Sequence, residues 1–387
     1  MIRKLALSIA AAAAVCSGAL ACRGRETAAA AATSATPSAA LVTPAAESSF
    51  ARLVRQLSES GGFFDSDNII SNETSYLHVI NGLRRLGVHG GVYVGVGPDQ
   101  NFSYVAAIRP SIAFMLDIRR DNLFEHLLFK ALFSMSRNRV EYLCLLFGKP
   151  VPHDVAAWRN RSIDDAIAYL DSTRTDSGVV RATQRTVNAK IAAYGLALSE
   201  TDLQVADRYR AQFVAEGLDV RFSSLNRNNR SSYPDLRSLI LETDRSGRRA
   251  SFLASDEAFQ YVKSMQDRDL IVPVVGDVAG EKAVRAIANY AAAHGLTISA
   301  FYISNVEQYL MRDGLFSRYA ENLKLLPRDA RSVIIRSYFG RFGGHPLTVP
   351  GHISTSMLQT FDMFVTEYNA GNIRTYLDLV ERGYVSP

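Results

Sequence analysis

The chain has 387 residues, 48% of them apolar, which is enough to fill the core of one large or two medium domains and excludes global disorder. Its 43 Lys and Arg against 38 Asp and Glu give a net charge of +5, or +3 without Arg3 and Lys4, so no nucleic-acid partner is expected. Three Cys and seven His are too few for a zinc-finger or disulfide scaffold.

Residues 1–21 have the pattern of an export signal peptide. Arg3 and Lys4 form a charged start, and an apolar stretch and small residues at a cleavage site follow. The stretch is too short for a stable membrane span. The next residue is Cys22, and residues 18–22 resemble a bacterial lipoprotein box, which implies a lipid on Cys22. We therefore expect an exported protein, either a lipoprotein anchored to a membrane through Cys22 or, as the alternative, a periplasmic protein without a lipid.

Residues 22–48 consist mainly of Ala, Thr, Ser and Pro and contain almost no large side chain. Such a segment cannot bury enough apolar surface to offset the entropy lost on ordering. We predict a disordered tether that precedes one domain over residues 49–387. Cys144 is the only other thiol of the mature chain, and its apolar surroundings in the sequence predict a small buried side chain.

From about residue 50, short apolar runs alternate with helical patterns, which is typical of a mainly parallel α/β sheet. A helix is predicted between the first two strands, ending before Pro110, and another over residues 281–293. This alternation predicts a doubly wound, mainly parallel, Rossmann-like sheet. The predicted strands are residues 91–96, 112–118, 271–275, 297–303 and 332–339.

Residues 121–265, between the second and third strands, have a mostly helical pattern. Ser162 with Asp165, and Ser199 with Asp202, have the spacing of capping boxes that begin helices. A crossover between parallel strands needs only about a dozen residues. The segment is therefore predicted to be a large helical insertion, either a cap over the strand ends or padding on one face of the sheet.

Gly95 lies near the end of the first strand, Gly97 directly follows it, and a helix comes next. Glycines at such a turn let the backbone approach a ligand closely, and the helix N-terminus favours anionic groups. Asp117 lies twenty residues beyond Gly97 at the end of the next strand, where a carboxylate can accept hydrogen bonds from ribose hydroxyls. Gly276 and Asp277 end the third strand in the same way. A tight turn in a sheet without a ligand is the alternative interpretation.

The sequence also restricts the kind of nucleotide. A dinucleotide fingerprint requires a third glycine, and Gln100 stands at that position. No Gly-Lys-Ser or Gly-Lys-Thr of a phosphate-binding loop occurs. Binding of a pyrophosphate is therefore disfavoured, and a nucleoside without phosphates is the remaining small-molecule partner.

Taken in order, these motifs and the run Ser304-Asn305-Val306-Glu307 resemble those of class I S-adenosylmethionine-dependent methyltransferases. Residues 60–345 are also similar to a bacterial family with that fold, through the runs Ser66-Asp67-Asn68 and Ser71-Asn72-Glu73-Thr74 among others. The resemblance implies S-adenosylmethionine as the cofactor. It places the glycine turn with Asp99 and Asn101 at the methionine moiety, Asp117 on the ribose, Asp277 and Val278 beside adenine, and Asn305 and Glu307 toward the methyl acceptor.

Methyl transfer requires alignment of acceptor and sulfonium and, for some acceptors, a base. Glu307 is the candidate base, with Asn305 orienting the acceptor and Tyr309 forming a wall. Equally, Asn305 could only cap the following helix. The segment that includes Ser71 and Asn72 is expected to fold over the pocket.

The seven histidines give no metal site by their positions in the sequence. His78 is expected to be a packed or surface side chain. His345 and His352 flank a loop rich in Gly and Pro, and no third ligand stands near them.

Two functional hypotheses remain. S-adenosylmethionine is made in the cytosol, whereas the N-terminus predicts export. The preferred interpretation is therefore an exported, methyltransferase-like protein with a nucleoside-binding cleft and unproven or lost catalysis. The alternative is an active S-adenosylmethionine-dependent methyltransferase that acts on an unidentified acceptor. The sequence does not identify a protein partner.

Overall fold

The computed structural model describes residues 47–224, 232–340 and 343–385, which belong to one unit, Pro44–Pro387. The predicted signal peptide, Cys22 and nearly all of the predicted tether lie outside the described residues. Among the helices that are described, none combines the length and the apolar character needed to cross a membrane.

Six strands form one sheet in the order β3-β2-β1-β4-β5-β6. The first five strands are parallel and β6 is antiparallel to β5, so the prediction of a doubly wound, mainly parallel α/β fold is confirmed. Helices cover both faces, which explains why strands such as β1 and β2 are buried along their whole length. The strands are β1 (Val92–Val96), β2 (Ile112–Asp117), β3 (Ile271–Val275), β4 (Ile298–Ser304), β5 (Val333–Tyr338) and β6 (Thr355–Thr360).

The strand order reverses beside β1, because β2 and β3 extend to one side of it and β4 and β5 to the other. In open α/β sheets, ligands bind at the carboxyl ends of the strands where the order reverses. The register places the predicted site residues at this edge, since Asp117 pairs with Val275 and Gly276 donates a backbone hydrogen bond of 2.8 Å to Asp117.

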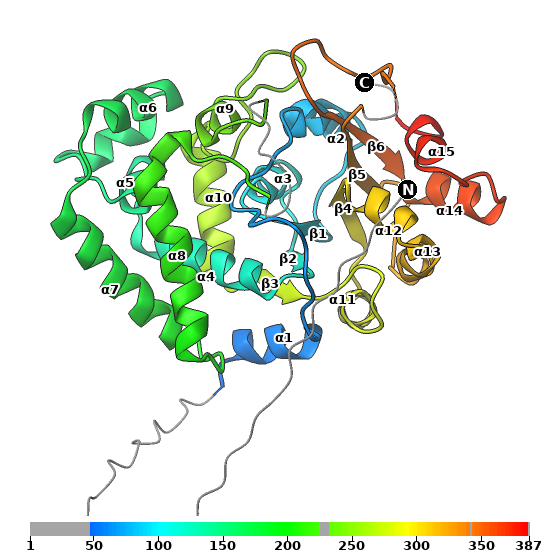
Figure 1. Ribbon diagram of the computed structural model, residues 1–387, viewed down its shortest axis with the longest axis horizontal. Helices are drawn as coiled ribbons and strands as arrows, with labels where there is room; N and C mark the ends of the chain where they lie inside the picture. The colour runs from blue at the N-terminus through cyan, green and yellow to red at the C-terminus, as the bar shows by residue number, and fades with distance from the viewer. Residues whose placement is uncertain (1–46, 225–231, 341–342, 386–387) are drawn as a thin grey trace, which may run out of the picture. The chain divides into compact units, whose positions relative to one another are not determined.

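The helices of residues 121–265 lie on one face of the sheet. The helix α4 packs on β2 and β3, and α8 packs on α4. Figure 1 shows α5, α7, α8 and α10 together on this side. The segment therefore pads one face, and both predicted capping boxes are present, at the starts of α6 and α8. The helices and short 3-10 turns from β1 to β3 are α3 (Asn101–Ile108), α4 (Arg120–Met135), α5 (Arg139–Phe147), η2 (Val155–Asn160), α6 (Ile163–Ser172), α7 (Ser177–Ala193), α8 (Glu200–Glu216), η3 (Gly217–Asp219), α9 (Leu236–Ile240) and α10 (Asp256–Asp267).

The remaining helices precede the sheet or cover its other side, where Figure 1 shows α11, α13 and α14. The helix α1 packs against β3 and α11, and α14 packs against β6. The remaining helices and the short 3-10 turn are α1 (Ser49–Leu57), η1 (Tyr76–Val79), α2 (Ile80–Arg85), α11 (Ala283–Ala293), α12 (Val306–Arg312), α13 (Phe316–Lys324), α14 (Phe361–Asn369) and α15 (Tyr376–Glu381).

Cys144, on α5, is buried as expected, and burial raises the pKa of its thiol to about 12.

Candidate functional site

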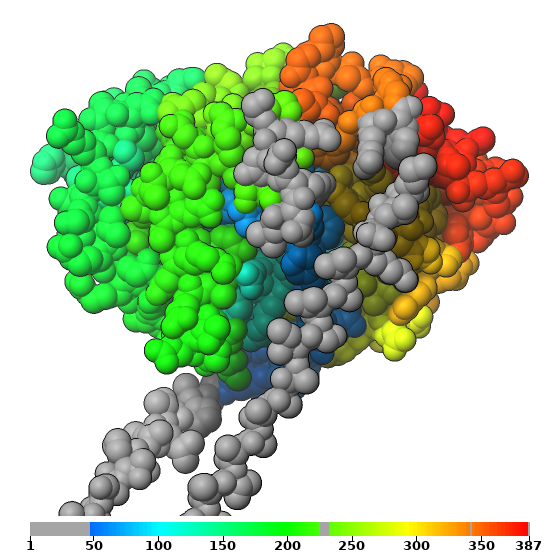
Figure 2. All heavy atoms as spheres, in the orientation of Figure 1, coloured from blue at the N-terminus to red at the C-terminus, as the bar shows by residue number. Residues whose placement is uncertain are grey.

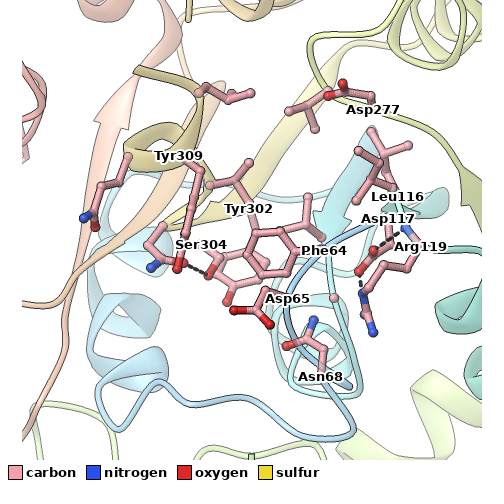
Figure 3. A pocket seen from close by; sticks show the side chains of 18 of the residues that line it. Phe64, Asp65, Asn68, Leu116, Asp117, Arg119, Asp277, Tyr302, Ser304 and Tyr309 are labelled. Atoms are coloured by element: carbon pink, nitrogen blue, oxygen red, sulfur yellow. Dashed lines mark hydrogen bonds and ion pairs between the residues drawn. The ribbon is translucent and has the colours of Figure 1, made fainter. Parts of the chain in front are cut away.

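A cavity of about 830 Å³ lies at the carboxyl ends of β1 to β4. This volume is within the range of pockets that bind cofactors and other small molecules. Figure 3 shows Asp117 with Arg119 on one side and Ser304 and Tyr309 on the other. The strand ends contribute Gly97, Asp117, Gly276, Asp277, Ser304 and Asn305 to the lining.

Residues 63–72, which precede the sheet in the chain, form another wall of the cavity. Ser71 and Asn72 line the cavity, as predicted, and so do Phe64 and Asn68. Backbone hydrogen bonds join the residues just before this segment to the ends of β3 and β2, from Glu59 to Val275 (2.9 Å) and from Gly62 to Ile118 (2.7 Å). Figure 2 shows the blue segment between the green helices and the olive C-terminal part.

The backbone of the glycine turn is held by the side chain of Asn101, which follows it. Gly97 lines the cavity with a φ of 84°, a conformation that favours glycine. Asn101 donates hydrogen bonds to the carbonyls of Val96 (3.0 Å) and Pro98 (2.8 Å). A Cβ on Gly95 would lie 1.9 Å from the Asn101 side-chain oxygen. Gly95 and Asn101 do not line the cavity, so the structure corrects their expected position beside a cofactor.

Asp99 does not line the cavity either. Burial raises the pKa of Asp99 to about 7, although hydrogen bonds from its own backbone N–H and that of Gln100 oppose the rise. This carboxyl belongs to the packed start of α3, and its expected contact with a methionine moiety is corrected in the same way.

Asp117 faces the cavity and is 9% exposed. One oxygen accepts from the backbone N–H of Arg119 (2.8 Å), and the other accepts from its guanidinium (3.0 Å). Arg119 also donates to the carbonyl of Asp67 (2.6 Å), which connects the end of β2 to the wall segment. Because a carboxylate can accept about four hydrogen bonds, Asp117 keeps capacity for a ligand hydroxyl.

Asp277 and Val278 line the cavity at the end of β3. Asp277 accepts a hydrogen bond from the backbone of Ala279 (2.8 Å), which fixes its side chain in the turn. Asn322 of α13 donates to the carbonyl of Val278 (3.0 Å). The turn after β3 is therefore rigidly placed at the edge of the cavity.

Asn305 and Tyr309 line the cavity from the turn after β4 and from α12. Asn305 occupies the N-cap position, but its side chain makes no capping hydrogen bond, so the capping alternative fails for the side chain. The Tyr309 ring packs edge-on against Phe64, with 5.0 Å between the ring centroids.

Glu307 points away from the cavity and is completely buried. It forms an ion pair with Arg336 of β5 (2.7 Å) and accepts from the Tyr319 hydroxyl (2.9 Å). Helical residues are spaced by about 100°, so Asn305 and Tyr309 share a face that position 307 cannot share. The structure thus corrects the expected role of Glu307 as a base that faces an acceptor.

The comparison of the sequence with protein families gives one match, to the family described as "Domain of unknown function (DUF7790)", over residues 68–370. The chain belongs to this family. The matched range includes all six strands and starts at Asn68 in the wall of the cavity, whereas Phe64 lies before it. No curated protein matches the sequence.

Several site residues were not predicted individually, among them Phe64, Asn68, Arg119 and Tyr302. The resemblance marked the runs that contain Asn68 and Ser304 but gave them no role. Arg119 directly follows the end of β2, and this position after a strand was the one signal that could have identified it.

Glu73, which does not line the cavity, is another buried carboxyl next to it. It accepts hydrogen bonds from the hydroxyls of Ser304, which lines the cavity, and Ser337 of β5. Burial raises the pKa of Glu73, although these hydroxyls oppose the rise. Ser304 reaches Glu73 from a sharp strand-to-helix turn, with a φ of 57°. A polar connection therefore runs from the cavity wall to a buried acid.

Proposed function

We propose that the cavity binds a nucleoside-type ligand of the S-adenosylmethionine class, in an exported protein with a methyltransferase-like fold. The observation that carries the proposal is the position of Asp117, which lines an 830 Å³ cavity at the point where the strand order reverses. At this position a carboxylate is suited to accept hydrogen bonds from ribose hydroxyls. Asp277 and Val278 would lie beside the base.

The charges around the cavity favour a cation over a phosphate. Both guanidinium groups of the lining are already paired, Arg119 with Asp117 (3.0 Å) and Arg312 with Asp313 (2.7 Å). A surplus of carboxylates attracts a sulfonium and repels a phosphate. The charged lining residues among those described are Asp65, Asp117, Asp277 and Asp313 with Arg119 and Arg312.

Phe64, in the wall formed by residues 63–72, also supports the proposal. Its ring is half-buried, lines the cavity and packs edge-on against Tyr309. An aromatic face of this kind provides a stacking surface for a flat base.

Thermal unfolding with and without ligand tests the proposal. At a concentration one hundred times the dissociation constant, S-adenosylmethionine or its demethylated product should stabilise the protein by about 2.7 kcal/mol. Asp117→Ala should abolish this stabilisation. Asp164→Ala, which removes an exposed carboxylate outside the cavity, should retain it. The absence of a shift with both compounds in the folded protein would end the proposal.

Active methyl transfer to an unidentified acceptor is the second candidate. It is favoured by Tyr309, which lies on the side of the cavity opposite Asp117 in Figure 3, and by Asn305, which lines the same cavity directly after β4. Release of the demethylated product, dependent on Asp117, distinguishes an enzyme from a binding protein.

We propose further that Cys22 carries a lipid and that the following tether separates the domain from the membrane. Two acyl signals would anchor such a protein without a spanning helix. In cells fed a clickable fatty acid, Cys22→Ser should lose both the label and the membrane fraction. Cys16→Ser is the matched control, because the predicted cleavage removes this residue. Soluble, unlabelled wild-type protein would contradict the anchor.

A further inference from the structure

Three side chains from distant parts of the chain meet away from the large cavity. His78 lies on η1, Glu242 follows α9, and His352 lies between β5 and β6. One ligand atom of each lies within 4.8 Å of those of the other two. The sequence offered no third ligand near His352, because His78 and Glu242 are 274 and 110 positions away from it.

The donor atoms have nearly the separations that a tetrahedral metal ion requires. His352 Nε2 is 3.3 Å from one Glu242 oxygen, and His78 Nε2 is 4.0 Å from the other. Ligand distances of about 2.1 Å around Zn²⁺ give tetrahedral edges of about 3.4 Å. The separation between His352 and Glu242 matches this value, and that between His78 and Glu242 is longer by less than an ångström. All three ligand atoms lie within 4.8 Å of one another.

The surroundings favour a bound ion over a simple ion pair. His352 Nε2 lies within hydrogen-bond distance of one Glu242 oxygen (3.3 Å), whereas His78 Nε2 lies 4.0 Å from the other oxygen and makes no hydrogen bond to it. His352 Nδ1 is buried and has no hydrogen-bond partner among the described residues. The backbone N–H of Thr243 donates to Glu242 (2.7 Å), which orients the carboxylate.

Burial is sufficient to hold a ligand set and still allows access. The His78 side chain is 7% exposed, whereas those of Glu242 and His352 are 18% and 20% exposed. The Arg245 guanidinium is close enough to His78 to act on it electrostatically. The Arg245 guanidinium donates to the carbonyl of Leu347 (3.1 Å), which gives it a fixed partner.

We propose that His78, Glu242 and His352 form a Zn²⁺ site with a fourth position for water. Two histidines and one glutamate are a known zinc ligand set that leaves one position open. The site joins the segment before β1, the end of the helical insertion and the loop before β6, so a bound ion links three regions of the fold. None of its residues lines the large cavity, and the proposal is independent of the nucleoside site.

Metal titration of the full chain tests this site. Metal-free protein should bind one Zn²⁺ per chain and resist thermal unfolding better with ZnCl₂ than without. Co²⁺ in its place should give the visible absorption of a four-coordinate site. His352→Gln and Glu242→Gln should weaken Zn²⁺ binding by more than about 100-fold, since even residues outside the ligand shell often change affinity by 10- to 100-fold.

His89→Gln is the matched control, because His89 is exposed and contacts only a backbone carbonyl of its own turn. It should bind Zn²⁺ as the wild type does. Circular dichroism without metal should show that the partly exposed His352→Gln variant is folded. The proposal is overturned if the folded wild type binds no stoichiometric Zn²⁺, or if folded His352→Gln binds it as tightly as the wild type.

Discussion

Glu73 and Glu307 are both completely buried beside β5, but they lie against opposite faces of that strand. Glu307 contacts the Arg336 guanidinium, and Glu73 contacts the hydroxyl of the next residue, Ser337. Side chains of neighbouring strand residues point to opposite faces, which separates the two environments. One face thus provides a positive charge for a buried carboxylate, and the other provides only hydroxyls.

The difference determines what each acid can do. A buried charge is costly unless it is paired. The ion pair therefore makes Glu307 a structural residue, on the side of α12 that faces away from the cavity. Burial raises the pKa of Glu73, which favours a neutral acid that contacts the cavity through Ser304. Of the two, only Glu73 connects to the candidate site.

Breaking the ion pair should give the largest effect on stability. Glu307→Ala leaves a buried guanidinium without its partner and should reduce the free energy of unfolding by about 3 to 5 kcal/mol. Urea unfolding measures the loss. The double variant Glu307→Leu with Arg336→Met should lose less than either single truncation, because it removes both charges. A loss below about 1 kcal/mol in Glu307→Ala would contradict the structural role.

A smaller and pH-dependent effect is expected at Glu73. The raised pKa means that the folded protein keeps a proton that the unfolded chain releases above the ordinary value of 4.5. Wild-type stability from this group is therefore complete below that pH and declines as the pH rises toward the folded pKa. Glu73→Gln cannot titrate and should become more stable relative to the wild type over the pH range above 4.5, by about 1.4 kcal/mol for each unit of raised pKa.

Thermal unfolding at several pH values measures this difference, with Glu257→Gln as the control because Glu257 is exposed on α10. A constant difference between Glu73→Gln and the wild type across this range would show that the two glutamates do not differ in the way their surroundings indicate.

The parallel strands could be predicted because they are continuous apolar runs with turn residues at their ends. The edge strand β6 (Thr355–Thr360) was missed, since four of its six residues are polar and antiparallel edge strands need no apolar run. The helical insertion was predicted from its length, but its position on one face depends on packing between α4, α8 and the sheet, which no local pattern specifies.

Site residues could be predicted only where they stand at the ends of parallel strands, because the fold brings these strand ends together. Asp117, Asp277 and Asn305 follow strands, and parallel strands bring their carboxyl ends to one edge. Glu307 was misplaced because its partner Arg336 is a single charge within an apolar run. Phe64 belongs to an irregular segment without periodicity, so nothing in the sequence positioned it over the cavity.

The wall segment over the cavity is attached at the carboxyl ends of β2 and β3. Backbone hydrogen bonds join Glu59 to Val275 and Gly62 to Ile118, and Arg119 holds the carbonyl of Asp67. A compound that reaches the strand ends therefore meets a wall segment that, among the described residues, these contacts already hold in place. We expect its association rate to follow diffusion and its own charge, since loop motion sets the pace only where a segment must close.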